Sequence, residues 1–493
     1  MRRRLRQLID RGEEGFSLIW IAMVLTLLLG MAAFGTDLGW LYLNAVRAQN
    51  AVDAAVLAGV VNLPGFSPQE DAYNAARANG YDPGGADDLV LTPTADNQLY
   101  GKLTTNVQPF FLRVLGFDNF TISRESTAQY IKPVPLGSPT NCFGGGSLAE
   151  CPGTGAEDFW AAASGRNSRL EDGDPYSTLC DLNNASGCTS SNGAYARGGA
   201  YPGYYYGIDV PSGQTSLQVH IWNGAWQPGG SGAAGDANFS GPNGAVTSEY
   251  TLYRPDTTPL IPQDHLDGTS TPVCSSNGSN GWAQLCSTIS DPTPGIWLVH
   301  VETVANPAGS NNFAIRAEGS PTTPRVYGIN DMSIWSDDLV QDSELYLAEV
   351  TEEHAGKKLE LAFYDAGDAF DQSFYSVLKP DGSVAQCTWR VYTAQYPDDS
   401  ATEVTSLSSG STPQTCRWET QVASPTGAAG RYNKLWIVAL IDLPEDPADM
   451  CDGSDCWWKM DLDLANPTER TTWRARVIGN PVRLVPVTTT TSP

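Results

Sequence analysis

The pattern of hydrophobic and polar positions begins with one long apolar run near the amino end. Residues 16–34 carry no charge, and these nineteen residues are about enough for a helix to cross the hydrocarbon core of a bilayer. Five arginines precede the run within residues 1–15, and basic residues are sparse after it. The apolar run and the positive-inside bias therefore predict a single-pass membrane helix, with the N-terminus in the cytoplasm and the bulk of the chain outside.

Two other interpretations of this run compete with a retained membrane helix. A cleaved secretory signal has a shorter apolar core and a small-residue exit site, whereas here the helical pattern continues through residues 38–57. A buried helix of a globular domain would not need the arginine-rich flank. We therefore expect residues 1–15 to form a basic cytoplasmic leader and residues 16–61 to form one transmembrane and juxtamembrane helix.

Small and apolar side chains recur at spacings of three and four beyond the membrane run. They form one stripe along the predicted helix, made of Leu38, Leu41, Ala45, Ala48, Val52, Ala55 and Gly59. Such a stripe lets another element approach the helix backbone closely. The pattern does not distinguish a domain of the same chain from a helix of a partner protein.

The rest of the chain alternates apolar and polar residues in short strands separated by turns. Residues 62–134 are predicted to form a small α+β region, and prolines and glycines mark residues 135–158 as a linker. Five sequence blocks then recur in one order, which predicts a duplication with repeats at 159–324 and 325–487 and a tail at 488–493.

The paired blocks indicate what each repeat folds into. Residues 217–223 correspond to 359–365, and residues 295–301 correspond to 434–440. Strands of this kind bury one face each, so the stable solution is two packed sheets. We expect a mostly β fold after the N-terminal helix, with two tandem β-sandwich repeats of jelly-roll-like form.

Two sequence motifs lie in the second half of the predicted helix. One is a D-L-G turn of helix and the other is a Q-x-A-x-D-A-A-x-L-A-G end, with motif residues Asp37, Gly39, Gln49, Asp53, Ala54, Ala55 and Gly59. With the apolar run before them, these motifs resemble the N-terminal segment of TadE/TadG-like proteins of tight-adherence (Flp-type) pilus assembly. The resemblance covers about residues 15–133. It implies a pilus-assembly component of the bacterial cell membrane, with contacts to other assembly or pilin subunits through the helix.

The resemblance also implies a processing site. In related pseudopilins a prepilin peptidase cuts after a glycine, and here that bond joins Gly15 and Phe16. Those proteins carry a glutamate five residues into the mature chain, which helps assembly. This chain has Trp20 at that position, and the departure weakens the expectation of both cleavage and entry into a fibre.

Charge and cysteine content narrow the function further. The net charge is −26, and the basic residues after the leader are scattered along the sequence. The chain therefore has no basic stripe that could bind nucleic-acid phosphates, which argues against nucleic-acid binding. Ten cysteines fall in close pairs, and outside a membrane such pairs indicate disulfides rather than metal sites. Nearest-neighbour pairing is the simplest hypothesis, although the sequence does not determine it: Cys142 with Cys151, Cys180 with Cys188, Cys274 with Cys286, Cys387 with Cys416, and Cys451 with Cys456.

Candidate chemistry is sparse. The sequence contains no G-x-S-x-G, no H-E-x-x-H and no paired Cys and His, so we expect no enzyme activity. We expect no cofactor, with calcium at Asp365, Asp368 and Asp371 as the one candidate, against a solvated acidic turn. Four aromatic residues are candidates for an exposed platform that binds a glycan or a protein, unless strand alternation buries them: Tyr204, Tyr205, Trp222 and Trp226.

Two functions remain after these exclusions. The first is a membrane-anchored TadE/TadG-like component of a tight-adherence pilus system, which displays two extracytoplasmic β-sandwiches for structural or adhesive contacts. The alternative is a membrane-tethered module that binds surface glycans or proteins and has no role in pili. A surface hydrolase is a third class, but no nucleophile and base can be named for it.

Overall fold

The computed structural model describes most of the chain as two compact units. The described residues are all except 1, 64–67, 96, 146–147, 149, 152–158, 165–202, 227–234, 239–246, 256–271, 279–280, 304–308, 337–341, 365–372, 394–400, 423–428, 464–468, 480–481 and 487–493. The first unit comprises Met1–Leu63, Ser67–Tyr130 and Val482–Pro493, and the second contains Ile131–Pro481. A long apolar helix is followed by a mostly β chain, as the sequence predicts.

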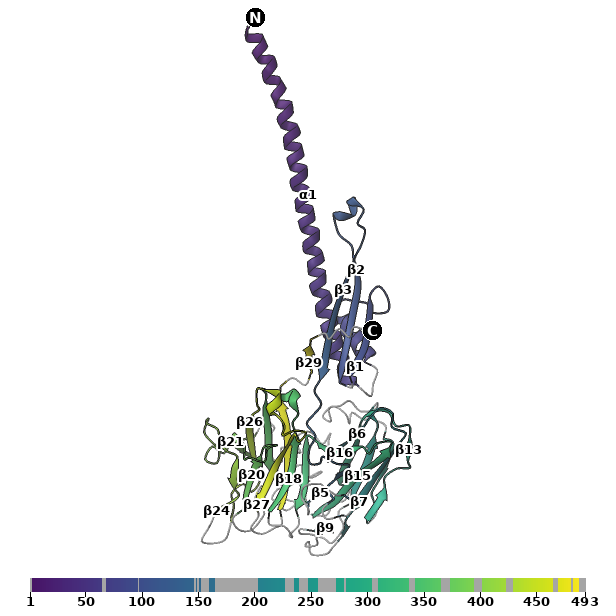
Figure 1. The fold of residues 1–493 in the computed structure, drawn as a ribbon, viewed down its shortest axis with the longest axis vertical. Coiled ribbons are helices and arrows are strands. Elements are labelled where there is room, and N and C mark those ends of the chain that lie inside the picture. Colours follow the sequence, from purple (N-terminus) through teal and green to yellow (C-terminus); the bar gives the residue numbers. More distant parts are fainter. Residues whose placement is uncertain are drawn as a thin grey trace, which may run out of the picture. The chain divides into compact units, whose positions relative to one another are not determined.

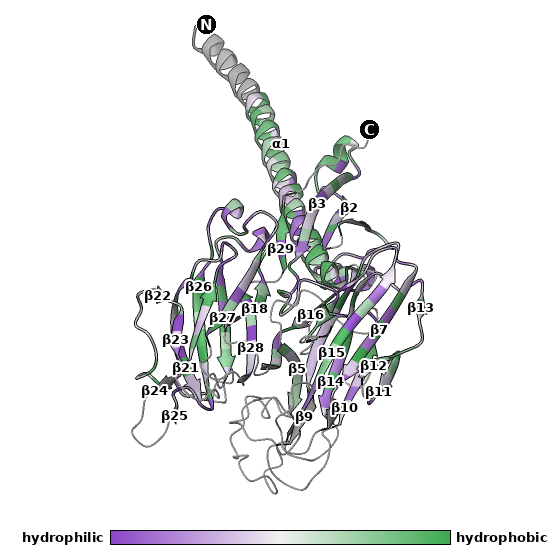
Figure 2. Cartoon of the chain, turned by 60° about the horizontal axis from the view of Figure 1, so that its bottom comes forward, coloured by the Kyte–Doolittle hydropathy of each residue, from purple (hydrophilic) through white to green (hydrophobic). Residues whose placement is uncertain are grey.

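The first unit is organised by one continuous helix, α1 (Arg2–Gly59), drawn as the long rod in Figure 1. No proline interrupts it, and leucine and alanine, which favour helices, dominate its length. From Leu18 onward it is long and apolar enough to cross a membrane, and Figure 2 shows the hydrophobic stretch. The large apolar side chains between Leu18 and Phe34 are exposed, as a lipid-facing helix requires.

A short sheet packs on the C-terminal part of α1. Strands β1 (Asp88–Ala95), β2 (Gln98–Val107) and β3 (Phe120–Tyr130) form an antiparallel meander, and helix α2 (Gln69–Ala78) precedes them. The fourth strand, β29 (Val482–Val485), pairs with the outer edge of β3.

Strand β29 corrects the predicted end of the second repeat at residue 487. Its residues Val482–Val485 pair with β3 of the first unit, with Val482 opposite Tyr130 and Leu484 opposite Ala128. The alternation of apolar residues in this segment fits any sheet edge, and β3 offers unpaired backbone groups there. The second unit is therefore inserted in the chain between two neighbouring strands of the first.

The second unit consists of two sandwiches that share one long sheet. In the first sandwich the separate sheet runs in the order β11 (Cys274–Ser276), β10 (Ser248–Tyr253), β14 (Gly295–Thr303), β6 (Tyr204–Val210) and β16 (Arg325–Ile329). In the second sandwich it runs β18 (Asp342–Glu349), β27 (Trp457–Asp463), β20 (Phe374–Leu378) and β23 (Arg417–Glu419).

The shared sheet passes through both sandwiches. Its order is β12 (Gly281–Gln284), β7 (Ser216–Asn223), β15 (Gly309–Ser320), β5 (Phe159–Ser164), β17 (Asp331–Ser336), β28 (Glu469–Ile478), β19 (Lys358–Tyr364), β26 (Leu435–Asp442), β21 (Gln386–Thr393) and β22 (Gln414–Thr415). Strands β5 and β17 join the two halves, with Trp160 opposite Trp335. One contiguous apolar core fills both sandwiches.

The remaining described elements are short. They are η1 (Val60–Asn62), η2 (Leu112–Leu115), β4 (Cys142–Phe143), β8 (Ala225–Trp226), β9 (Gly235–Asn238), β13 (Ile289–Ser290), η6 (Glu352–His354), β24 (Gln421–Val422), β25 (Ala429–Gly430) and η7 (Pro447–Asp449).

The topology shows the duplication and corrects one of its sequence blocks. Strand β14 lies between β10 and β6, and the strand in the same place of the second sandwich is β27, between β20 and β18. The sequence instead matched β14 with β26, which pairs with β19 in the shared sheet. Both β14 and β26 are central strands with an apolar run and a buried tryptophan, Trp297 and Trp436. Hydrophobic pattern alone cannot distinguish two such strands.

The boundary and linker predictions also need correction. Strand β16 follows the predicted boundary at 324/325, yet it pairs with β6 of the first sandwich. Strand β4 falls in the predicted linker 135–158 but pairs with β15, with Cys142 opposite Arg316. Its Phe143 is buried in the core against Tyr206, which explains why this proline-rich segment is folded.

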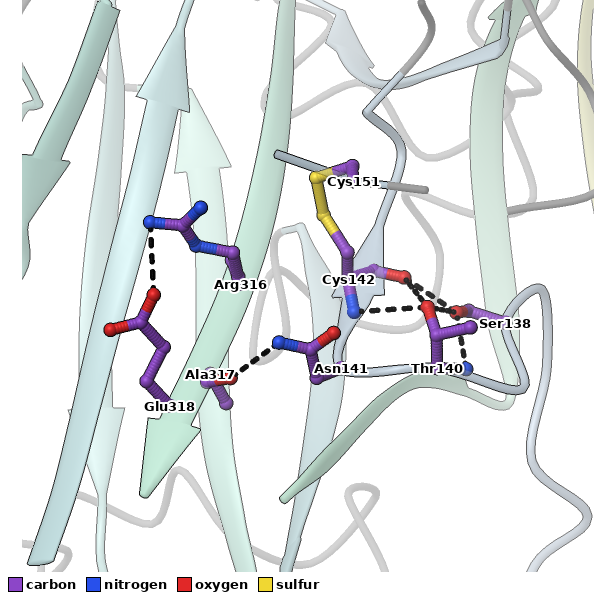
Figure 3. Close-up of a disulfide and its surroundings, with 8 residues drawn as sticks. All are labelled: Ser138, Thr140, Asn141, Cys142, Cys151, Arg316, Ala317 and Glu318. Atoms are coloured by element: carbon purple, nitrogen blue, oxygen red, sulfur yellow. Dashed lines mark hydrogen bonds and ion pairs between the residues drawn. A yellow bond between two sulfur atoms is a disulfide. The ribbon is translucent and has the colours of Figure 1, made fainter. Parts of the chain in front are cut away.

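Four disulfides form between nearest-neighbour cysteines, as predicted: Cys142–Cys151, Cys274–Cys286, Cys387–Cys416 and Cys451–Cys456. The fifth predicted pair, Cys180 with Cys188, lies outside the described residues. Around the first disulfide, Asn141 donates its side-chain N–H to the Ala317 carbonyl at 2.9 Å, and Ser138 and Thr140 hydrogen-bond the turn (Figure 3). The disulfide thereby fastens a loop that is docked on β15.

Two disulfides occupy equivalent places in the two sandwiches. Cys274 lies on the edge strand β11 and Cys286 follows β12, the edge of the shared sheet in the first half. Cys387 lies on β21, near the other end of the shared sheet, and Cys416 precedes the edge strand β23. Each disulfide thus joins the two sheets of its sandwich at the edge away from the β5–β17 junction.

Candidate functional site

The candidate functional residues of the helix motif lie where α1 meets the sheet of the first unit. Asp37 is fully buried, and its carboxylate accepts three backbone N–H groups from the loop between β2 and β3. The distances are 2.7 Å from Phe110, 2.9 Å from Phe111 and 2.6 Å from Leu112. Charge-assisted hydrogen bonds of this kind are stronger than neutral ones. The aspartate therefore holds the loop against the helix.

Gln49 makes the second polar connection of the motif. Its side-chain N–H groups reach the Asp53 carboxylate at 2.9 Å and the Glu125 carbonyl on β3 at 3.1 Å. In the opposite direction, Arg124 on β3 donates to the Ala45 carbonyl of α1 at 3.3 Å. Asp53 thus orients Gln49, and Gln49 fixes the position of the helix along β3.

Ionic contacts support the same strands. Lys102 on β2 and Glu125 on β3 lie 3.0 Å apart across the register. The hydrogen bond from Lys102 lowers the pKa of the Glu125 carboxyl, and Glu125 in turn raises the pKa of Lys102. At the end of β3, burial raises the pKa of Tyr130 to about 12.

The small residues of the motif permit close packing. A side-chain carbon added to Gly59 would lie 2.9 Å from the Leu99 side chain and 2.8 Å from the Pro68 carbonyl oxygen. Ala55 is fully buried, and Ala54 is half-buried. Gly39 differs, because nothing lies within 4 Å of a carbon added there.

The structure answers the question that the small-residue stripe left open. Five of its positions are buried against the sheet and α2 of the same chain: Ala45, Ala48, Val52, Ala55 and Gly59. Leu38 is exposed and Leu41 is half-buried, so the covered stripe begins beyond them. The stripe from Ala45 onward packs on its own domain and offers no surface to a partner helix.

The proposed processing residues lie within the unbroken backbone of α1. Gly15 and Phe16 are helical, as are the residues on either side. Cleavage of the bond between them stays a prediction of the family resemblance.

The predicted exposed aromatic platform is wrong for two of its four residues. Tyr204 and Tyr205 are buried, Tyr204 in the main core and Tyr205 in a second cluster with Ile296 and Ile329 on the opposite face of the sheet. Both faces of β6 are covered, so alternation exposes neither residue. Trp222 is half-buried against Trp160, with ring centroids 4.5 Å apart. The Trp226 side chain lies outside what the structure describes.

The calcium candidate cannot be located, because Asp365, Asp368 and Asp371 all fall outside the described residues. Among the residues that the structure does describe, no group of three or more His, Cys, Asp or Glu side chains gathers as a metal site would require.

Comparisons with known proteins bear on the helix alone. Residues 15–62 match the family model described as putative Flp pilus-assembly TadE/G-like. The N-terminal segment is TadE/G-like. This segment includes most of α1 and every motif residue discussed above. Among them, Asp37, Gln49 and Gly59 make the contacts that fasten α1 to the rest of the first unit. The chain is a membrane-anchored protein related to pilus assembly.

The chain was also compared with curated proteins and with solved structures. No curated protein matches the chain. Among solved structures, the chain is similar to the N-terminal CBM22-1-CBM22-2 tandem domain of Paenibacillus barcinonensis Xyn10C, at 10% identity over 80% of this chain and 92% of that one. The TM-score is 0.10, and a likeness of that size carries no argument.

The contact between Asp37 and the loop at residues 108–119 was not predicted from the sequence, which places this loop only within the small α+β region 62–134. The available signal is the apolar group Phe110, Phe111 and Leu112, which follows the end of β2 after two intervening residues.

Proposed function

We propose that this protein is a structural component of a tight-adherence pilus assembly system. Its helix anchors it in the cell membrane, and its two sandwiches project outside the cytoplasm for structural or adhesive contacts. The observation that carries the proposal is the continuity of α1, which runs from the apolar segment into a domain held by the TadE/G-like motif residues Asp37 and Gln49. A helix fastened in this way transmits position and force between the membrane and the folded part.

The architecture of the second unit supports a mechanical role. The strand pair β5–β17 makes the two sandwiches one continuous sheet, so neither can rotate without breaking backbone hydrogen bonds. Disulfides between the sheets, Cys274–Cys286 and Cys387–Cys416, limit opening at the outer edges. A unit of this stiffness can serve as a spacer or an adhesive head, whereas two sandwiches joined by a flexible linker would transmit less force.

The connection of the second unit to the first supports the same role. The chain leaves the first unit after β3 and returns through β29, with Tyr130 paired to Val482. Two adjacent backbone connections therefore carry any load on the sandwiches to the helix-bearing sheet.

The orientation belongs to this proposal. The arginine-rich leader favours a cytoplasmic N-terminus, and disulfides are stable in the oxidising space outside. We also propose that the protein acts without catalysis, since its sequence contains neither the G-x-S-x-G nor the H-E-x-x-H motif of hydrolases. The alternative of an independent glycan-binding module has lost two of its four platform residues to burial, Tyr204 and Tyr205.

The test is complementation of cells that lack this protein. We expect such cells to lose surface pili and attachment, and the wild-type chain to restore both. A variant carrying Asp37→Ala and Gln49→Ala is expected to restore less at an equal amount in the membrane. Asn50→Ala, an exposed position on the same helix, is the matched control and should restore fully. Unchanged pili and attachment in the deletion strain would contradict the proposal.

A further inference from the structure

We propose that the loop between β2 and β3, residues 108–119, is a second membrane contact that inserts its apolar side chains into the outer leaflet beside α1. We call it the aromatic loop. The inference rests on the membrane anchoring of α1 and does not depend on the pilus role.

The aromatic loop exposes an unusual amount of apolar surface for its length. Five of its large apolar side chains are 50–87% exposed, and Leu112 is half-buried: Phe110 59%, Phe111 50%, Val114 87%, Leu115 73% and Phe117 54%. Contiguous apolar patches on a protein surface mark contact with a membrane or another protein. The only charged residues in the loop are Arg113 and Asp118.

Contacts with α1 hold the aromatic loop at a fixed position along the helix axis. Asp37 fixes the amides of Phe110, Phe111 and Leu112, and the Phe110 ring lies 5.2 Å from the Trp40 ring. Asp37 follows Phe34, the last large apolar residue of the membrane run, by three residues, a rise of about 4.5 Å along a helix. Figure 1 shows the tip between β2 and β3 projecting alongside α1.

The tryptophans of α1 also indicate how deep the aromatic loop lies in the membrane. Trp20 and Trp40 are separated by 20 positions (40 − 20), or about 30 Å of helix, which equals the thickness of a hydrocarbon core. Tryptophans concentrate at the two membrane–water interfaces. Trp40 therefore marks the outer interface, and Phe110, in contact with it, lies at the same depth.

The charges near the loop fit this placement. A carboxylate near the bilayer is costly unless it is satisfied, and Asp37 is buried with three N–H donors from the loop itself. Arg113 has an aliphatic stem that can lie along apolar surface while its guanidinium reaches the headgroups. Bacterial anionic lipids would attract that charge.

Lipid is favoured over a protein partner because the patch is continuous with a membrane helix. The side chains that neighbour Asp37 along α1, Leu38 and Phe34, are each 56% exposed. They extend the apolar surface from the aromatic loop to the lipid-facing run, and only Gly35, Thr36 and the buried Asp37 separate them along the helix. A second contact of this kind would fix the rotation and tilt of the first unit on the membrane.

The experiment places an environment-sensitive fluorophore on the full chain in vesicles of phosphatidylethanolamine and phosphatidylglycerol. Val114→Cys carries it at the loop tip. Thr94→Cys is the matched control, because Thr94 is exposed near the end of β1, beside the turn into β2 and at the other end of the β2 strand from the loop. The wild-type chain, treated in parallel, reports any labelling of native cysteines. We expect a blue-shifted emission at position 114 that brominated lipids quench, and a water-like, unquenched emission at position 94.

Two results would overturn the proposal. If position 114 is as water-exposed as position 94, the loop does not enter the membrane. If position 114 is shielded from water but brominated lipids do not quench it, a protein surface covers the loop instead. A second variant, Val114→Glu with Leu115→Glu, should leave α1 inserted and raise the exchange of the loop amides with water; unchanged exchange would also count against lipid contact.

Discussion

The Asp37 carboxylate accepts the backbone N–H of Leu112 at 2.6 Å, across 75 residues of sequence. This hydrogen bond, with those from Phe110 and Phe111, connects the helix that leaves the apolar segment to the loop of a folded sheet. The aspartate of the TadE/G-like motif thus has a structural task that can be measured.

Replacing Asp37 by alanine is expected to release the aromatic loop. Three backbone amides in part-buried hydrogen bonds lose their acceptor, so hydrogen exchange at Phe110, Phe111 and Leu112 should quicken by about one to two orders of magnitude. Mass spectrometry of exchanged peptides measures this. Asn50→Ala is the control and should leave the loop peptides unchanged; equal exchange in both variants would contradict the role given to Asp37.

Substitutions of two glycines in the same helix are expected to have different effects on the free energy of unfolding. Gly59→Val introduces atoms close to Leu99 and Pro68, and overpacking of this kind costs about 1–3 kcal/mol of unfolding free energy. Gly39→Ala meets no atom within 4 Å, so it should leave stability unchanged or raise it by up to about 1 kcal/mol. Thermal unfolding in detergent compares the two, and a harmless Gly59→Val would refute the close packing described.

The disulfides are expected to differ in their contribution to stability. Cys387–Cys416 closes a separation of 29 residues and Cys451–Cys456 one of 5, so the chain-entropy model gives about 3–4 kcal/mol for the first and about 2 kcal/mol for the second. Double serine variants of each pair, unfolded in denaturant, provide the comparison. A larger loss from the Cys451–Cys456 pair would show that the sheet-to-sheet disulfide is not the principal constraint.

Truncation after Ile478 is expected to loosen the first unit and spare the second. Removing β29 leaves the outer edge of β3 unpaired, so exchange should rise at the β3 amides that face it, near Ala128 and Tyr130. Peptides from β19 and β26 act as the internal control, because they lie in the shared sheet. If β3 exchange does not change, β29 does not stabilise the sheet.

The local parts of this fold were predictable from the sequence. The apolar run, the helix end at Gly59 and four disulfides between near neighbours each depend on residues close together in the chain. The strands and the two sandwiches followed from alternating patterns and from the repeat.

What the sequence withheld depends on distant partners. The Arg483 guanidinium donates to Gln129 at 2.9 Å across 354 residues, and nothing local in β29 indicates that pairing. Tyr205 is buried because the second face of its sheet is also covered, which alternation does not anticipate. The misassigned block at β14 and β26 has the same origin, since two central strands share one apolar pattern.

The orientation of the chain across the membrane is the central claim, and thiol labelling tests it most directly. Single cysteines are introduced at Arg6 in the leader and at Thr94 beyond the membrane, and spheroplasts are treated with a membrane-impermeant maleimide. With a cytoplasmic N-terminus, Thr94→Cys is labelled in intact spheroplasts and Arg6→Cys is labelled only after lysis. Labelling of Arg6→Cys before lysis, with Thr94→Cys protected, would contradict this orientation.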